Sequence, residues 1–221
     1  MATTYEGITF ERLGHASKRL ETADGTVIYV DPWGEQLEDE PGDADVVFVT
    51  HDDFDHYDPE AIAAVAGDDA TVAIYEAVDT SDLAEDVIDL PLEGEVTVDG
   101  IDVETVPAYN DPAGDHVDDD GEPFHAEGEV IGLLLDLEGT TVFIPSDTDF
   151  LPHHESITAD VFVPPIGGHF TMDRREAADF ARSVEADLVL PEHYDTFDPI
   201  ETDADAFAAD LEADGIRVDL F

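Results

Sequence analysis

The stretch that decides the fold of this chain reads Val46-Val47-Phe48-Val49-Thr50-His51-Asp52-Asp53-Phe54-Asp55-His56. Its first four residues are apolar, three of them valine, and they lack helical periodicity, so they predict a short buried strand. Asp58 and Pro59 follow as the N-cap and first residue of a helix that we expect to end near Ala66. The residues between strand and helix therefore lie on the kind of loop that carries chemistry in α/β proteins.

Four potential metal ligands fall within six residues of that loop: His51, Asp53, Asp55 and His56. In so acidic a chain, a solvated acidic loop is the simple alternative. Two histidines around two alternate aspartates favour a metal site, because the chain has only nine histidines. Imidazole and carboxylate together are the ligands that suit first-row transition metals.

The pattern His51-x-Asp53-x-Asp55-His56 resembles the His-x-His-x-Asp-His signature of the metallo-β-lactamase superfamily, with Asp53 in place of the second histidine. Further segments occur in the family's order over nearly the whole chain and resemble its UlaG-like, lactonase-type branch. These are Gly14-His15-Ala16-Ser17, Asp31-Pro32-Trp33, Val106-Pro107-Ala108-Tyr109-Asn110, Phe124-His125, Ser146-Asp147-Thr148-Asp149, residues 165–173 and His193-Tyr194-Asp195-Thr196.

The resemblance implies one domain over residues 1–221 with an α+β fold, the αββα sandwich. In that fold two mixed β-sheets pack face to face, with helices on both outer faces. It also implies two divalent metal ions, zinc first, with manganese or iron as alternatives. One ion would be held by His51, Asp53 and His125, the other by Asp55, His56 and His193, with Asp147 bridging the two.

By the same resemblance, the protein is a metal-dependent hydrolase. Two metals would activate a hydroxide to attack an ester, a lactone or a phosphodiester. Asp55 would orient the nucleophile and carry its proton, and His169 would donate to the developing oxyanion, ahead of Tyr109 and Tyr194. The alternative is a non-catalytic metal-binding protein that keeps the fold.

Two other positions depart from the family pattern. The residue after His125 is usually proline and is Ala126 here, and the residue before Asp147 is more often glycine and is Ser146 here.

The composition is strongly acidic, since 7 Lys and Arg stand against 58 Asp and Glu, a net charge of −51. Because 43% of the residues are hydrophobic, the chain can still build a core. The acidic residues are spread over every expected loop and helix, which indicates a halophile, where molar salt screens repulsion between them. This charge says nothing about the substrate.

The absence of cysteine excludes disulfides and thiolate ligands. We find no signal-peptide pattern and no apolar run of the ~18 residues needed to span a bilayer. We therefore expect a soluble, cytoplasmic protein that acts on a small molecule, with no membrane insertion and no nucleic-acid partner, because acidic surfaces repel phosphates. The oligomeric state stays open.

Several other features stay open or await a structure. His15 either bonds a turn between the first two strands or lies near the active site, and no role is assigned to His116. His153 and His154 are expected to be exposed on a surface helix. Ser81 should cap a short helix at residues 83–86, and Asp173 should form a capping box with Glu176. No internal repeat is visible.

Overall fold

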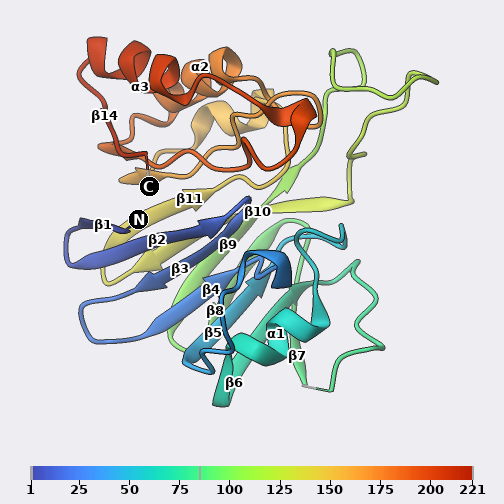
Figure 1. Ribbon diagram of the computed structural model, residues 1–221, viewed down its shortest axis with the longest axis vertical. Helices are drawn as coiled ribbons and strands as arrows, with labels where there is room; N and C mark the ends of the chain where they lie inside the picture. The colour runs from blue at the N-terminus through green and yellow to red at the C-terminus, as the bar shows by residue number, and fades with distance from the viewer. Residues whose placement is uncertain (1, 85, 221) are drawn as a thin grey trace.

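Two mixed β-sheets of seven strands each form the centre of the protein (Figure 1). The computed structural model describes residues 2–84 and 86–220. The first sheet contains, in spatial order, β1 (Ala2–Tyr5), β2 (Ile8–Gly14), β3 (Ser17–Glu21), β4 (Val27–Val30), β5 (Ala44–Val49), β6 (Ala66–Tyr75) and β7 (Val87–Leu90). The second contains β8 (Gly94–Val98), β9 (Ile101–Ala108), β10 (Val130–Leu137), β11 (Thr140–Ile144), β12 (Val161–Phe162), β13 (Leu188–Val189) and β14 (Arg217–Val218).

Both sheets are built on the same plan. In the first sheet, β1 to β4 are antiparallel neighbours, and β4 to β7 are parallel. In the second, β8 to β11 are antiparallel and β11 to β14 are parallel. The two halves of the chain therefore repeat one topology, although no repeat can be read from their residues.

Helices cover the outer face of each sheet, which confirms the predicted αββα arrangement. Helix α1 (Pro59–Val65) packs Ile62 and Val65 against the first sheet, whereas α2 (Arg174–Val184) and α3 (Ala204–Ala213) pack against the second. Figure 1 shows α1 at one end of the molecule and the other two helices at the opposite end. Three short 3₁₀ helices, η1 (Gly34–Gln36), η2 (Pro152–Ser156) and η3 (Asp198–Ile200), lie in the connections.

The strand β11 shows how the sequence separates the two cores. Val142 and Ile144 face the first sheet and join the apolar core between the sheets, while Phe143 between them faces the helices and stacks on Phe162. This alternation follows from the two-residue period of a strand. The predicted strand 46–49 forms most of β5 and is completely buried near the middle of the first sheet.

The helix starts largely agree with the sequence. The Asp58 carboxylate accepts bonds from the amides of Glu60 and Ala61, and Asp173 caps α2 in the same way. The prediction of a capping box at α2 is wrong in one respect. The Glu176 carboxylate does not bond back to the Asp173 amide but accepts from the amide of Phe150.

Two smaller predictions are corrected or left aside. His153 is exposed as expected, but it lies on the single 3₁₀ turn η2, and the neighbouring His154 is completely buried, its ring stacked 5.1 Å from that of Phe180. The short helix expected at residues 83–86 includes residue 85, which lies outside the described residues.

Candidate metal centre

The predicted ligands meet at one edge of the sandwich, where parallel strands end. Asp31 follows β4, Thr50 and His51 follow β5, and Asp147 follows β11 by three residues. His193 follows β13, and His125 comes from the long loop between β9 and β10. Because the carboxyl ends of parallel strands share an edge, ligands far apart in sequence come together there.

A first group of donors consists of His51, Asp53 and His125, whose ligand atoms lie within 4.8 Å of one another. The Asp53 Oδ2 atom is 3.2 Å from His125 Nε2 and 3.6 Å from His51 Nε2. Both histidines are buried, whereas half of the Asp53 side chain is exposed. The Asp53 carboxylate therefore lies within reach of both histidines while part of its side chain stays open to solvent.

A second group consists of Asp55, His56 and His193, together with His15. His15 Nε2 lies 2.9 Å from Asp55 Oδ2, and the His15 ring is 4.1 Å from the ring of His193. Of the two interpretations left open for His15, the structure therefore supports the position near the active site.

Asp147 lies between the two groups. Its Oδ1 atom is 3.5 Å from His56 Nε2, and its Oδ2 atom is 3.1 Å from His193 Nε2 and 3.5 Å from His125 Nε2. Burial alone would raise the pKa of this carboxyl, but the neighbouring His193 and His56 outweigh burial and hold the pKa well below its usual value. One carboxylate therefore faces three imidazoles drawn from both groups.

The donor set fits divalent metal ions. The Nε2 atoms of His51 and His56 are buried and have no hydrogen-bond partner among the described residues. Burying a nitrogen without a hydrogen-bond partner costs free energy, unless the nitrogen binds a ligand such as a metal ion. Burial lowers the pKa of His51, but the neighbouring carboxylates of Asp53 and Asp147 outweigh burial and raise the pKa to about 9. Such a cluster of imidazoles and carboxylates is suited to an added positive charge.

Asp31 orients one of these histidines from behind. Its Oδ2 atom lies 3.0 Å from His56 Nδ1 and accepts the Thr50 hydroxyl at 2.8 Å, while its Oδ1 accepts the Thr50 amide. Burial would raise the pKa of Asp31, but His56 lowers it, so the carboxylate is ionised and only accepts. His56 Nδ1 therefore carries the proton, and the Nε2 lone pair faces the centre.

His125 and His51 are held in a similar way. The Asn110 Oδ1 atom accepts the His125 amide at 2.8 Å and lies 3.2 Å from its Nδ1, while the Asn110 Nδ2 group donates to Asp149. The Thr50 hydroxyl is 3.0 Å from His51 Nδ1 and 2.8 Å from the Ser146 hydroxyl. The sequence segments contained Asp31, Thr50 and Asn110, but no pattern in them indicated these positioning roles.

Backbone strain gathers at the centre. His15, Asp31, Ser146 and His193 all have positive φ angles between 47° and 59°. Residues with a Cβ atom avoid this left-handed region at a cost of order 1 kcal/mol or more, and such strain clusters at functional sites. At Ser146 the φ angle of 59° is one that glycine adopts freely and serine adopts only with strain.

The other candidates lie further out. His169 is exposed, and its ring packs against Phe170 at 4.4 Å and Phe124 at 5.2 Å. Tyr109 stacks on His153, and the Tyr194 ring lies under the guanidinium of Arg12. The oxyanion role of His169 stays a prediction. His116, to which the sequence assigned no role, has its Nδ1 atom 2.6 Å from Asp149 Oδ1, and the same oxygen accepts from the side-chain Nδ2 of Asn110.

A cavity of about 370 Å³ opens over the predicted ligands. Its floor is polar and its walls are aromatic, and His169 is not among the residues that line it. The lining consists of Asp53, Phe54, Asp55, Phe124, His125, Asp147, Phe170, His193, Phe197 and Pro199.

The fold and this centre define a class of protein, the β-lactamase superfamily, whose domain matches residues 9–193. A metal-dependent hydrolase of the UPF0173 group from Methanopyrus kandleri is 32% identical over 94% of this chain and 93% of its own length. A second one, from Salinibacter ruber, is 30% identical over 94% of both chains. The chain belongs to this UPF0173 family of metal-dependent hydrolases within the β-lactamase superfamily.

Solved structures agree with this assignment. The crystal structure of a metal-dependent hydrolase from Parabacteroides distasonis superimposes with a TM-score of 0.84 at 26% identity and covers 99% of this chain and 97% of its own. The metallo hydrolase Igni18 from Ignicoccus hospitalis gives a TM-score of 0.79 at 24% identity, over 97% and 94% of the two chains, a likeness of fold. In the described part of this chain, no helix is long and apolar enough to cross a membrane.

Proposed function

We propose that this protein hydrolyses an ester, lactone or phosphodiester of a small molecule at a centre that holds two divalent metal ions. The observation that carries the proposal is the position of Asp147, whose two oxygens face histidines of both donor groups. One ion is assigned to His51, Asp53 and His125, the other to Asp55, His56 and His193, with Asp147 shared between them. Zinc is the first choice of metal, and manganese and iron are the alternatives.

When bound, such metals would polarise the scissile group and lower the pKa of an attacking water. The chain's own residues then provide orientation and proton transfer. His15 is buried, and burial lowers its pKa to about 4, so its neutral ring donates from Nε2 to Asp55. This bond fixes the carboxylate of Asp55, which accepts the proton of the attacking water. His169 is the candidate donor at the rim for the developing oxyanion.

The proposal keeps the finer expectations of the sequence. The UlaG-like segments favour a lactonase-type enzyme, and the acidic composition favours a halophile and a cytoplasm rich in salt. The lactonase-type assignment is supported by the segments around Gly14, Asp31, Asn110 and His193, which all adjoin the centre.

A turnover screen in molar salt tests the function. p-Nitrophenyl acetate, γ-lactones and bis-p-nitrophenyl phosphate are offered with and without a chelator. We expect turnover of at least one, lost with the chelator and restored by zinc or manganese. If metal binds and none of these substrates turns over, the chain would be a non-catalytic metal-binding protein instead.

Elemental analysis tests the ligand assignment separately. We expect two metal equivalents in the unaltered chain and the loss of at least one in each of His56→Ala, Asp147→Ala and His193→Ala. The control variant is His153→Ala, which removes an exposed histidine outside the centre and should keep both equivalents. Two metal equivalents in all three test variants would contradict the ligand assignment.

A further inference from the structure

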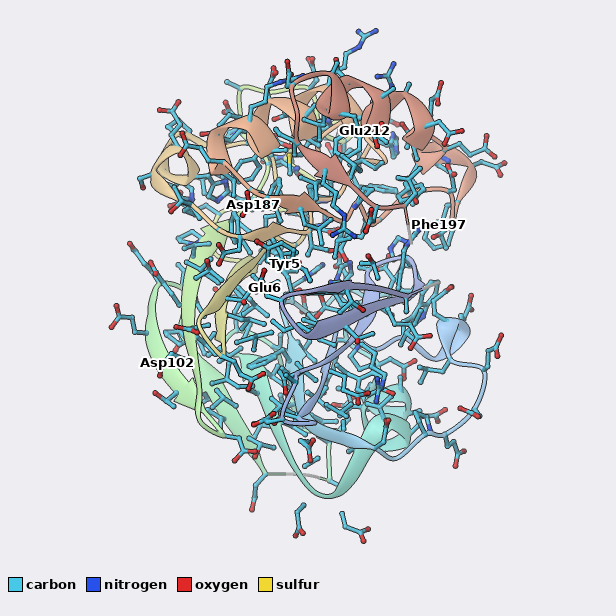
Figure 2. All side chains as sticks on the ribbon, turned by 90° about the vertical axis from the view of Figure 1, so that its left-hand side faces the viewer. Tyr5, Glu6, Asp102, Asp187, Phe197 and Glu212 are labelled. Carbon is cyan, nitrogen blue, oxygen red and sulfur yellow. The ribbon has the colours of Figure 1, made fainter. Side chains whose placement is uncertain are left out.

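Two groups of aromatic rings lie at the cavity, which is lined by Phe54, Phe124, Phe170 and Phe197, with Trp33 buried against Phe54 and Phe197. The first comprises Trp33, Phe54 and Phe197, with ring centroids 5.8–6.5 Å apart. The second comprises Phe124 and Phe170, whose rings meet edge to face at 5.0 Å. Phe197, labelled in Figure 2, lies at the edge of the molecule between its two halves. Loops distant in sequence therefore build two apolar walls above one polar floor.

The exposure of Phe54 is the strongest indication that the aromatic rings bind a ligand. Its side chain is 67% exposed, and it is the only large apolar residue exposed to that degree among residues 2–84 and 86–220. It also stands directly between two predicted ligands, Asp53 and Asp55, and lines the cavity. One exposed phenylalanine is ordinary on a protein surface. A ring that is exposed above the candidate metal centre and shares the lining of one cavity with Phe124 and Phe170 is what an apolar ligand group would cover.

The lining of the cavity offers no cationic side chain to the part of a substrate that lies above the metal centre. None of its lining residues is lysine or arginine, whereas three are aspartates. Two cations lie close by but are engaged. The Arg12 guanidinium covers the Tyr194 ring at 4.1 Å and donates to the Tyr194 carbonyl, and Lys18 is buried 2.7 Å from Glu192. Proteins that bind phosphate usually present such groups to it.

We propose that the substrate is a neutral carboxylic ester or lactone that carries an apolar acyl or aryl group. The apolar group sits between the wall of Trp33, Phe54 and Phe197 and the wall of Phe124 and Phe170, which brings the scissile carbonyl to the floor. This inference rests on the proposed hydrolase function. The oxygen of water bonds to the carbonyl carbon, the acyl C–O bond breaks, the alkoxide oxygen takes one proton of the water, and the carboxylic acid gives the other to solvent.

A substrate series tests this specificity. With the metal-loaded protein in molar salt, we expect kcat/KM to rise at least tenfold from p-nitrophenyl acetate to the octanoate, because the longer chain buries more apolar surface. Phe54→Ala and Phe197→Ala should each reduce the octanoate value by about tenfold and the acetate value much less. Leu92→Ala removes a partly buried apolar residue outside the cavity and should leave the ratio unchanged.

The single tryptophan provides a readout without turnover. Octanamide, a neutral apolar ligand, should change the fluorescence of Trp33, and the change should weaken in Phe54→Ala. Dimethyl phosphate should have no effect. Turnover of bis-p-nitrophenyl phosphate alone, or equal activity on all ester lengths, would overturn the apolar-ester inference and leave the hydrolase proposal standing. An absence of all turnover, with no response of Trp33 to octanamide, would overturn both.

Discussion

Asp31 shows how much of a metal centre depends on residues that would never touch the metal. Its two oxygens bind the Thr50 amide, the Thr50 hydroxyl and His56 Nδ1, and so fix the end of β5 and one ligand at once. The charge of the carboxylate makes these bonds stronger than neutral ones. Partners of this kind commonly change metal affinity by 10–100-fold when they are lost.

We therefore expect Asp31→Asn to weaken metal binding by roughly 10–100-fold while the circular dichroism spectrum stays unchanged. The amide keeps the size of the side chain but accepts more weakly and can present a donor to His56. Competition with a chromophoric chelator measures the affinity. Asp45→Asn is the matched control, because Asp45 bonds the Val27 amide outside the centre and should leave affinity unchanged. Unaltered affinity in Asp31→Asn would contradict the role.

Asp53 gives the second prediction at this scale. Two divalent ions with the three aspartates Asp53, Asp55 and Asp147 give a net 4 − 3 = +1, against 4 − 2 = +2 for a set with histidine at position 53. Oxygen-rich sites tolerate manganese and iron better relative to zinc. We expect Asp53→His to shift the metal content toward zinc, as measured by elemental analysis after equilibration with equal zinc and manganese.

Asp53→Ala should lose one metal equivalent, because Asp53 lies 3.2 Å from His125 and 3.6 Å from His51. Its exposed neighbour Asp52 provides the control, and Asp52→Ala should keep full occupancy. If both alanine variants bind the same amount of metal, the Asp53 carboxylate is not a ligand.

At the scale of elements, η2 shows where the sequence pattern fails. The adjacent His153 and His154 look alike in sequence, but a tight turn directs the His154 side chain into the apolar core between the second sheet and its helices, where it stacks on Phe180. His154 Nε2 donates to the Pro107 carbonyl at 3.0 Å, and its Nδ1 accepts the Leu151 amide. Burial, and to a lesser extent the repulsion of His153, lower the pKa of His154 to about 4.

This predicts acid sensitivity at constant molar salt. The unfolded chain takes up the proton near pH 6.5 and the folded chain only near pH 4, so the contribution of His154 to stability is present above 6.5 and is lost between 6.5 and 4. The loss is of order 3 kcal/mol at most. The free energy of unfolding should therefore fall less over this range in His154→Gln than in the control His153→Gln. Equal slopes would contradict the prediction.

The strands and helices were easier to predict than the contacts between them. The strand at residues 46–49 and the helix that begins at Pro59 follow from local pattern, and both are confirmed. The four ligands near residue 51 also share one loop, so their spacing is visible in sequence. The bond from His15 to Asp55 joins residues 40 apart, and that from Asn110 to Asp149 joins residues 39 apart. Such pairs depend on how the strands are ordered, which no local pattern contains.

The surface determines the behaviour of the whole molecule. The chain carries −51 charges, and several of its few cations already pair with acids: Arg182, for example, pairs with Asp179, Asp210 and Asp214. Figure 2 shows carboxylate oxygens around the whole outline. Repulsion among them grows as ionic strength falls, because the Debye length rises from about 3 Å at 1 M salt to about 30 Å at 0.01 M.

We expect dialysis from molar potassium chloride to low salt to lower the melting temperature and then to remove the circular dichroism signal. Sucrose at equal osmolality is the control, since it favours compact states without screening charge, and should restore much less of the melting temperature than salt does. The same melting temperature at both salt concentrations would contradict the halophile interpretation.

The repeated topology has a mechanical consequence. One half of the chain supplies His51, Asp53, Asp55 and His56, and the other supplies His125, Asp147 and His193, so the centre lies on the seam between them. Under the proposed ligand assignment each ion would take donors from both halves of the chain, so bound metal would link the two halves. Pulling the halves apart would empty the site in the same event, and loading it would hold the two sheets together.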